Sequence, residues 1–355
     1  MTRQGFSVTQ AGLAIGAYGL GNFMASILGG HLADTIGRRK TIVISMGSVA
    51  VSMLLLSQAR TFAEIVLLTA LTGLTGELYR PASSALLADL VPAGQRVTVY
   101  AIYRLAFNAG WAFGPATAGF LAAHSFTWLF IGDAVTSLLF GLVAWFALPR
   151  GIHAQQQQVS WSTALSHAFA DRRLLQVLGA LLLVAPAFFQ MSSTFGLQVV
   201  ARGFSPATYG ALISMNGVLV VLFELPLTAL TQKFSPRRVM ALGYVLIGFG
   251  FALNAFAETI AAFALAVTIF TLGEMISMPV STAYIADLSP PHLRGRYMGT
   301  YAFTWSIALM FSPAAGMSLF AVNPIALWVG CGALGLLAAA IVLREPPAHS
   351  PQRES

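Results

Sequence analysis

Apolar stretches about twenty residues long follow one another along most of the chain, separated by short polar turns. An α-helix needs about 20 residues of this kind to cross a bilayer. Because lipid offers no partner to a free backbone N–H or C=O group, these segments are predicted to be helices. The eleven predicted spans are Val8–Gly29, Ile42–Ala59, Phe62–Leu87, Val97–Ala123, Trp128–Leu148, Leu174–Val200, Tyr209–Leu230, Val239–Ala257, Ile260–Ile285, Met298–Phe320 and Ile325–Leu343.

The composition supports a membrane protein built from helices alone. Hydrophobic residues make up 57% of the chain and charged residues only 9%, whereas soluble domains carry about 25% charged residues. A chain with so few charges cannot cover a surface that faces water on all sides. We therefore predict an all-α, multi-pass membrane protein.

Basic residues gather at alternate turns between the predicted spans. If the turn at Arg38–Lys40 is cytoplasmic, alternation places fourteen of the nineteen Lys and Arg residues on that side and three on the other. An excess of positive charge at cytoplasmic turns is usual in membrane proteins. This reading accounts for the net charge of +7 without a nucleic-acid partner, and it predicts a cytoplasmic C-terminus.

One segment of the chain occurs twice. Half of the sixteen positions of Pro81–Arg96 are identical in Pro279–Arg294, 198 residues later, and the same offset relates Tyr103 to Tyr301. An offset without gaps indicates two parallel copies of one multi-helix unit. Parallel repeats of this kind are typical of secondary transporters, in which the substrate site lies between the repeats.

The repeat predicts the organisation of the chain. Two helical bundles would occupy 1–149 and 174–344, joined by a polar linker at 150–173 and followed by a disordered tail at 345–355. The span Leu174–Val200 has no mate in the first bundle. We therefore expect a further helix to precede Met1 in the complete repeat.

A short loop after the first span carries a recognisable pattern. Gly29–Lys40 reads G-G-H-L-A-D-T-I-G-R-R-K, which resembles the signature loop of the major facilitator superfamily, G-x-L-A-D-x-x-G-R-[RK]. The resemblance implies the fold of that family, with helices 2–6 of its pattern in the first bundle and helices 7–12 in the second. It is closest to bacterial multidrug-efflux members, which implies a location in the inner membrane. The gating-loop residues that it assigns are Gly30, Asp34, Gly37, Arg38 and Arg39.

Charged residues bracket a turn in each copy of the repeat. Asp89 and Arg96 bracket the first turn, and Asp287 and Arg294 bracket its twin. By resemblance to the family, Asp34 and Arg96 would form part of a charge network that locks the outward-open state. The alternative is a set of surface ion pairs, each worth about 0–1 kcal/mol.

A second motif lies within the span Val97–Ala123. Residues 110–119 read G-W-A-F-G-P-A-T-A-G, which resembles the antiporter motif of the same superfamily. Gly110 and Gly114 have the spacing of a close helix contact, Pro115 is expected to bend the helix, and Gly119 closes the motif. The alternative is a packing face of small residues.

Six ionisable residues fall inside predicted spans, where a charge costs about 2.5–3.5 kcal/mol. They must pair or line a hydrated cavity, as a carrier requires. Glu77 and Arg80 can pair at i,i+3. Glu274 and Glu77 are the best candidates to carry a proton, because a buried carboxyl group takes up a proton more readily. The six residues are Glu77, Arg80, Arg104, Asp133, Glu224 and Glu274.

Polar and aromatic residues at mid-helix positions could line a pocket for bulky apolar or cationic compounds, although for any single one of them helix packing is the better explanation. Aromatic rings would hold a cation through its attraction to the ring face. The polar candidates are Asn22, Tyr103, Asn108, Gln190 and Asn216, and the aromatic ones are Trp111, Phe188, Phe189 and Trp305.

Together these patterns predict a secondary transporter that works by alternating access, most simply a proton-coupled exporter of small compounds. An uptake symporter for a small metabolite and a truncated remnant without transport activity are the alternatives. The sequence contains neither H-E-x-x-H nor G-x-S-x-G and has a single cysteine, so we expect no enzyme, no metal and no cofactor. The expected partners are a small-molecule substrate, protons and the bilayer, and the protein is expected to be a monomer.

Overall fold

The computed structural model describes residues 8–149 and 170–344, and within these two ranges every regular element is a helix. The predicted linker and tail lie mostly outside the described residues. The helices of the first range are α1 (Val8–Thr35), α2 (Arg38–Leu56), α3 (Phe62–Glu77), α4 (Tyr79–Leu90), α5 (Ala93–His124) and α6 (Phe126–Ala147). Those of the second range are α8 (Arg172–Phe189), α9 (Thr194–Ala201), α10 (Pro206–Thr231), α11 (Pro236–Leu253), α12 (Ile260–Leu288), the 3₁₀ turn η2 (Pro291–Leu293), α13 (Arg294–Val322) and α14 (Pro324–Leu343).

Local signals set several of the helix starts. Thr61 caps α3 in a capping box, because its hydroxyl accepts a bond from the Glu64 N–H while the Glu64 carboxylate accepts one from the Thr61 N–H. Gly37 forms the turn between α1 and α2 with φ of 99°, a conformation that favours glycine. The tight turn expected from the loop pattern is confirmed at this residue.

Three helices begin one turn earlier than the apolar pattern predicts. α2, α5 and α13 start at Arg38, Ala93 and Arg294, each four residues before the predicted span. The additional turns are polar, so hydropathy alone does not reveal them. They carry Arg38, Arg96 and Arg294 at one end of the molecule, which we call the arginine-rich end.

Two predicted spans are interrupted. Pro81 has no N–H to donate to the Glu77 carbonyl, and the span splits at Leu78 into α3 and α4. The span that begins with α8 breaks after Phe189, where the Gln190 side chain takes over backbone hydrogen bonds: its Nε2 donates to the carbonyls of Pro186 (2.9 Å) and Ser312 (3.2 Å). Gln190 is therefore buried and structural, and the prediction that it lines a pocket is wrong.

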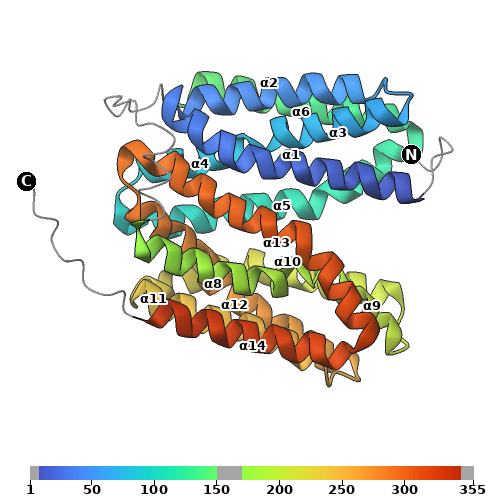
Figure 1. Ribbon diagram of the computed structural model, residues 1–355, viewed down its shortest axis with the longest axis vertical. Coiled ribbons are helices and arrows are strands. Elements are labelled where there is room, and N and C mark those ends of the chain that lie inside the picture. Colours follow the sequence, from blue (N-terminus) through green and yellow to red (C-terminus); the bar gives the residue numbers. More distant parts are fainter. Residues whose placement is uncertain (1–7, 150–169, 345–355) are drawn as a thin grey trace, which may run out of the picture.

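The helices form two bundles that lie side by side, α1–α6 above and α8–α14 below in Figure 1. The repeat offset pairs α1 with α10, α2 with α11, α5 with α13 and α6 with α14. The packing follows this pairing, because α2 packs on α6 as α11 packs on α14. Between the bundles α1 packs on α13, and α5 packs on α10. The two contacts are equivalent, because the repeat converts α1 into α10 and α13 into α5. A two-fold relation between the bundles requires this, and it confirms the repeat.

The outer surface matches a bilayer. Nine helical segments within the described residues are long and apolar enough to cross a membrane, and α1 and α5 also run the length of the first bundle (Figure 1). Large apolar side chains point outward, among them Leu67, Phe146 and Val322 at 70%, 80% and 84% exposure. The larger buried core lies in the second bundle, around Phe251, Phe270 and Trp328.

Candidate functional site

The middle of the molecule holds one arginine between two glutamates. Arg104 on α5 donates from Nε to Glu224 Oε1 on α10 at 2.9 Å, and from Nη2 to Glu274 Oε1 on α12 at 3.1 Å. The glutamate side chains are 0% and 7% exposed. The three residues come from both bundles, so this contact ties α5 of the first bundle to α10 and α12 of the second.

Polar neighbours fix the second carboxylate. Asn216 on α10 donates to Glu274 Oε2 at 3.1 Å and to Thr271 Oγ1 at 2.9 Å, and the Thr271 hydroxyl donates to the Val267 carbonyl at 2.6 Å. The amide thus holds Glu274 in place without neutralising it. With both glutamates ionised, the cluster of Arg104, Glu224 and Glu274, which we call the central triad, carries a net charge of −1.

A negative cluster out of water can take up a proton. Two carboxylates that share one cation oppose each other's ionisation, and a buried charge without full compensation is costly. The central triad therefore remains a candidate for the predicted proton site. Of its members, the sequence singled out Glu274, and Glu224 and Arg104 were further candidates.

A separate ionic pair lies within the first bundle. Arg80 and Glu77 form the i,i+3 ion pair that their spacing predicts, and the Tyr18 hydroxyl donates to Glu77 Oε1 at 3.1 Å. The Arg80 guanidinium also lies 4.8 Å from the centre of the Phe107 ring. Glu77 and Arg80 form a one-to-one pair, whereas Glu224 and Glu274 share a single cation, so Glu77 is a weaker proton candidate than the triad glutamates.

At the arginine-rich end, two ion pairs join the bundles, and each bundle supplies the arginine of one pair and the aspartate of the other. Arg294 pairs with Asp89, and Arg96 pairs with Asp287. The repeat offset of 198 converts the first pair into the second. Arg38 also contacts Asp89 at 3.2 Å and donates to the Pro291 carbonyl at 3.1 Å, so the two bundles are held together at this end.

Asp34 closes the same end through a helix terminus. It accepts bonds from the N–H groups of Gly295 (2.9 Å) and Arg296 (2.8 Å) in the first turn of α13, where the helix dipole favours a negative charge. It also pairs with Arg38 at 2.9 Å. Asp34 and Arg96 both belong to the charge network, as expected, but each contacts a different part of the second bundle.

Glycine allows this approach. A Cβ atom at Gly30 of α1 would lie 2.6 Å from the Gly295 carbonyl oxygen of α13, so a larger residue would push the two helices apart. Gly30 is therefore a close contact between the bundles. Gly110 of the antiporter-like motif is different, because a Cβ atom there would meet nothing within 4 Å, and the predicted close packing at Gly110 is wrong.

Other predicted residues fall into three groups. Asn22 accepts a hydrogen bond from Ser306 across the bundle interface at 3.0 Å, and Tyr103 shares a hydrogen bond with Tyr79. Asp133 is exposed on α6 and has no ion-pair partner within 8–149 and 170–344, so of the two predicted roles pairing is wrong and lining a hydrated cavity stays a prediction. α5 is helical throughout 110–119, but the side chains of Trp111, Gly114, Pro115 and Gly119 lie outside the described part.

Comparison with known proteins identifies the family. The model of the Major Facilitator Superfamily matches residues 1–201 and 197–355, which together cover the chain. The chain belongs to the major facilitator superfamily. Members of this family are membrane transporters, so the protein is a multi-pass transporter of small molecules rather than an enzyme.

Its relatives within the superfamily are distant. The uncharacterized MFS-type transporter YqjV of Bacillus subtilis is 26% identical over 310 residues, covering 85% of this chain and 75% of YqjV. A Na(+), Li(+), K(+)/H(+) antiporter of Planococcus maritimus is 24% identical over 342 residues, covering 87% of this chain and 79% of the antiporter. The crystal structure of the human organic anion transporter MFSD10 matches with a TM-score of 0.79 at 19% identity, over 96% of this chain and 87% of that one. The last match shows the shared fold.

Proposed function

We propose that this transporter exports small apolar or cationic compounds in exchange for protons, with the central triad as the proton site. The observation that carries the proposal is the contact of Arg104 with both Glu224 and Glu274, at 2.9 Å and 3.1 Å. In this contact one positive charge faces two negative charges, and the three residues come from both bundles. A change of protonation there acts directly on the contact that joins them.

The coupling follows from the partners of Arg104. While both glutamates are ionised, the guanidinium holds α5 against α10 and α12. When one glutamate takes up a proton, Arg104 loses one of two charge-assisted bonds, which are stronger than neutral ones. The bundles then separate more readily at this level and approach each other elsewhere. Proton uptake and rocking of the bundles are thereby linked.

The arginine-rich end supports the same scheme. It is closed by the exchanged pairs and by the Asp34 contact with α13, and Arg96 and Arg104 are eight residues apart on α5, about 12 Å along the helix. Closure at that end leaves the opposite end free to open. If the positive-inside pattern gives the orientation, closure at this end corresponds to an outward-facing state, with the C-terminus in the cytoplasm.

The driving force is sufficient for export. One proton contributes about 2.3 kcal/mol per 100 mV of membrane potential and about 1.4 kcal/mol per pH unit. Exchange of one proton for a neutral substrate could therefore support a hundredfold or larger gradient.

The substrate preference rests on charge and on aromatic rings. The central triad is negative, and Phe188, Phe189 and Trp305 form an edge-to-face group between α8 and α13, with ring centres 5.5–5.9 Å apart. Such rings bind flat apolar groups and cations. The relative from Planococcus maritimus, a cation/H⁺ antiporter by its name, is consistent with this class.

Transport into proteoliposomes tests the proposal. Purified protein is reconstituted with a pH-sensitive dye inside the vesicles, and a panel of lipophilic cations is added under an imposed pH gradient. We expect substrate to accumulate on the side from which protons leave, with proton movement opposite to the substrate. Movement of both in the same direction would indicate the symport alternative, and transport indifferent to pH gradient and potential would refute coupling.

A further inference from the structure

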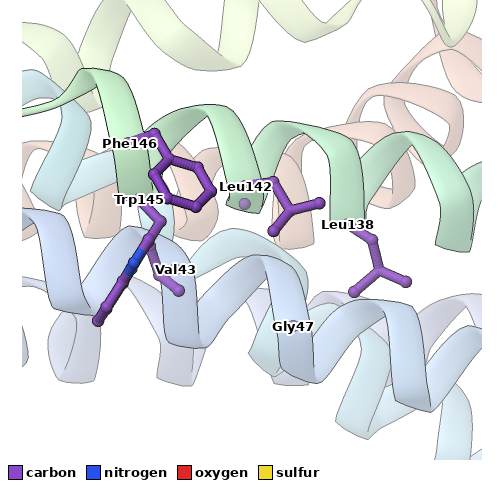
Figure 2. A pocket seen from close by; sticks show the side chains of 7 residues that line it. Val43, Gly47, Leu138, Leu142, Trp145 and Phe146 are labelled. Atoms are coloured by element: carbon purple, nitrogen blue, oxygen red, sulfur yellow. The ribbon is translucent and has the colours of Figure 1, made fainter.

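A groove runs along the outside of the first bundle between α2 and α6. Its volume is about 320 Å³, and Figure 2 shows Val43 and Gly47 of α2 facing Leu138, Leu142, Trp145 and Phe146 of α6. The α6 residues are between 45% and 80% exposed, so the groove opens to the side, towards the hydrocarbon of the bilayer. All of its lining residues are apolar.

The groove lies within one leaflet and points to its surface. Trp145 and Val43 lie at one end, near Arg39, and Leu138 lies at the other end (Figure 2). Arg39 and Gly47 are eight residues apart on α2, or about 12 Å. Half of the hydrocarbon core is about 15 Å thick. The groove therefore has the length and direction of one acyl chain that starts at the membrane surface.

Two cations stand at the surface end of the groove. The Arg39 guanidinium lies 4.8 Å from the centre of the Trp145 ring and donates to the Leu148 carbonyl at 3.4 Å, and Lys40 is exposed. Neither pairs with a carboxylate of the described residues. Their neighbour Arg38 differs, because its guanidinium already forms ion pairs with Asp34 and Asp89. Arg39 and Lys40 are thus available to an anion at the point where a lipid phosphate lies.

The matching positions of the second bundle differ. The offset of 198 replaces Gly47 by Val245 and Gly141 by Ala339, which add side chains along the seam between α11 and α14. Arg237, the mate of Arg39, donates to Tyr284, to Gln176 and to the Arg344 carbonyl. The space at Gly47 and Gly141 and the guanidinium of Arg39 therefore have no counterpart at the matching positions, whereas Arg238, the mate of Lys40, is exposed as Lys40 is.

We propose that the groove binds one acyl chain of an anionic phospholipid whose phosphate is held by Arg39 and Lys40. A basic group beside an apolar groove at the membrane surface matches both parts of such a lipid. Lateral access from the bilayer suits a lipid rather than a soluble phosphate compound. The inference depends on the membrane location of the chain and not on the proposed proton coupling.

Native mass spectrometry of the delipidated full-length protein tests this site. The protein is titrated with phosphatidylglycerol, phosphatidylcholine and glycerol 3-phosphate. We expect a saturable first site for phosphatidylglycerol, weaker binding of the zwitterionic lipid and no binding of the headgroup alone. Equal binding of the two lipids, or binding of glycerol 3-phosphate, would overturn the proposal.

Variants separate the two parts of the site. The double variant R39Q/K40Q is expected to weaken phosphatidylglycerol binding about 25-fold, at about fivefold for each basic contact. Gly47→Leu fills the groove without a clash, because a Cβ atom there meets nothing within 4 Å, and it should remove the same site. Leu138→Trp fills the groove from α6 and replaces Gly47→Leu if that protein fails to fold.

Matched controls lie in the second bundle. K233Q/R238Q removes two exposed basic residues, and Gly330→Leu enlarges a glycine with open space around it. Both should bind phosphatidylglycerol as the wild type does. The proposal is wrong if the controls weaken binding as much as the test variants, or if R39Q/K40Q leaves it unchanged.

Discussion

Two ionic clusters join the bundles, and they differ in charge balance. At the arginine-rich end, three carboxylates face three guanidinium groups, because Asp34, Asp89 and Asp287 contact Arg38, Arg294, Arg96 and the start of α13. In the middle, the single guanidinium of Arg104 faces Glu224 and Glu274. A cluster with equal numbers of opposite charges can hold the two bundles together as a clasp. An unbalanced cluster away from water can respond to protons.

The largest effect is expected at Glu274. Glu274→Gln keeps the shape and the Asn216 contact but removes the group that can exchange a proton, so substrate accumulation driven by a gradient of one pH unit should collapse from about tenfold to unity. Proteoliposome flux measures this. Glu77→Gln is the control within the first bundle, and we expect it to retain driven transport; equal loss in both variants would place the proton site outside the triad.

Removal of the shared cation is expected to destabilise the protein. Arg104→Met leaves two buried carboxylates without a cation, and breaking a buried pair in this way costs about 3–5 kcal/mol. A thermal unfolding series in detergent should show a lower midpoint at neutral pH and partial recovery at acidic pH, where the glutamates become neutral. A midpoint equal to that of the wild type at all pH values would contradict the ionised triad.

The two exchanged pairs should differ in strength. Asp89 is 12% exposed and also contacts Arg38, whereas Asp287 is 43% exposed and has one arginine partner. Asp89→Asn should therefore open the arginine-rich end more than Asp287→Asn. Single cysteines on α4 and α12, in a Cys331→Ser background, report the opening through their rate of labelling. The reverse order would show that burial does not set the strength of the clasp.

The smallest expected effect is that of salt. Ions screen exposed pairs over about 8–10 Å at 0.1–0.15 M but act weakly on buried ones. Raising the salt concentration should increase labelling at the arginine-rich end in the Asp89→Asn protein, which relies on the exposed Arg96–Asp287 pair, and should leave Arg104 contacts unchanged. A wild-type protein as sensitive as Asp89→Asn would argue that both pairs are exposed in solution.

Much of the architecture could be read from the sequence. The constant offset predicted the two bundles, and the pairing of α1 with α13 and of α5 with α10 follows from it. The Gly37 turn and the Glu77–Arg80 pair are local features, fixed by residues close together in the chain. These predictions succeeded because backbone conformation and i,i+3 spacing do not depend on distant contacts.

The partners of Arg104 could not be read in the same way. Glu224 and Glu274 lie 120 and 170 residues away in the sequence. Their predicted depth in the membrane does not tell which faces of their helices are turned toward α5. For Asp133 the cost of a charge in lipid predicts either a partner or a hydrated cavity, and the sequence does not decide between them. The expectation of a helix before Met1 stays a prediction.

The break at Gln190 depends on a single side chain for its hydrogen bonding. A helix that ends inside a bilayer leaves backbone carbonyl groups without hydrogen-bond donors. Here the Gln190 amide supplies them: its nitrogen donates to the carbonyls of Pro186 and Ser312, and its oxygen accepts bonds from Ser193 and Thr194. The short helix α9 beyond the break is held in the core through Phe195 and Val199. A substitution such as Gln190→Leu would remove all four of these hydrogen bonds at once, although it lies outside both ionic clusters.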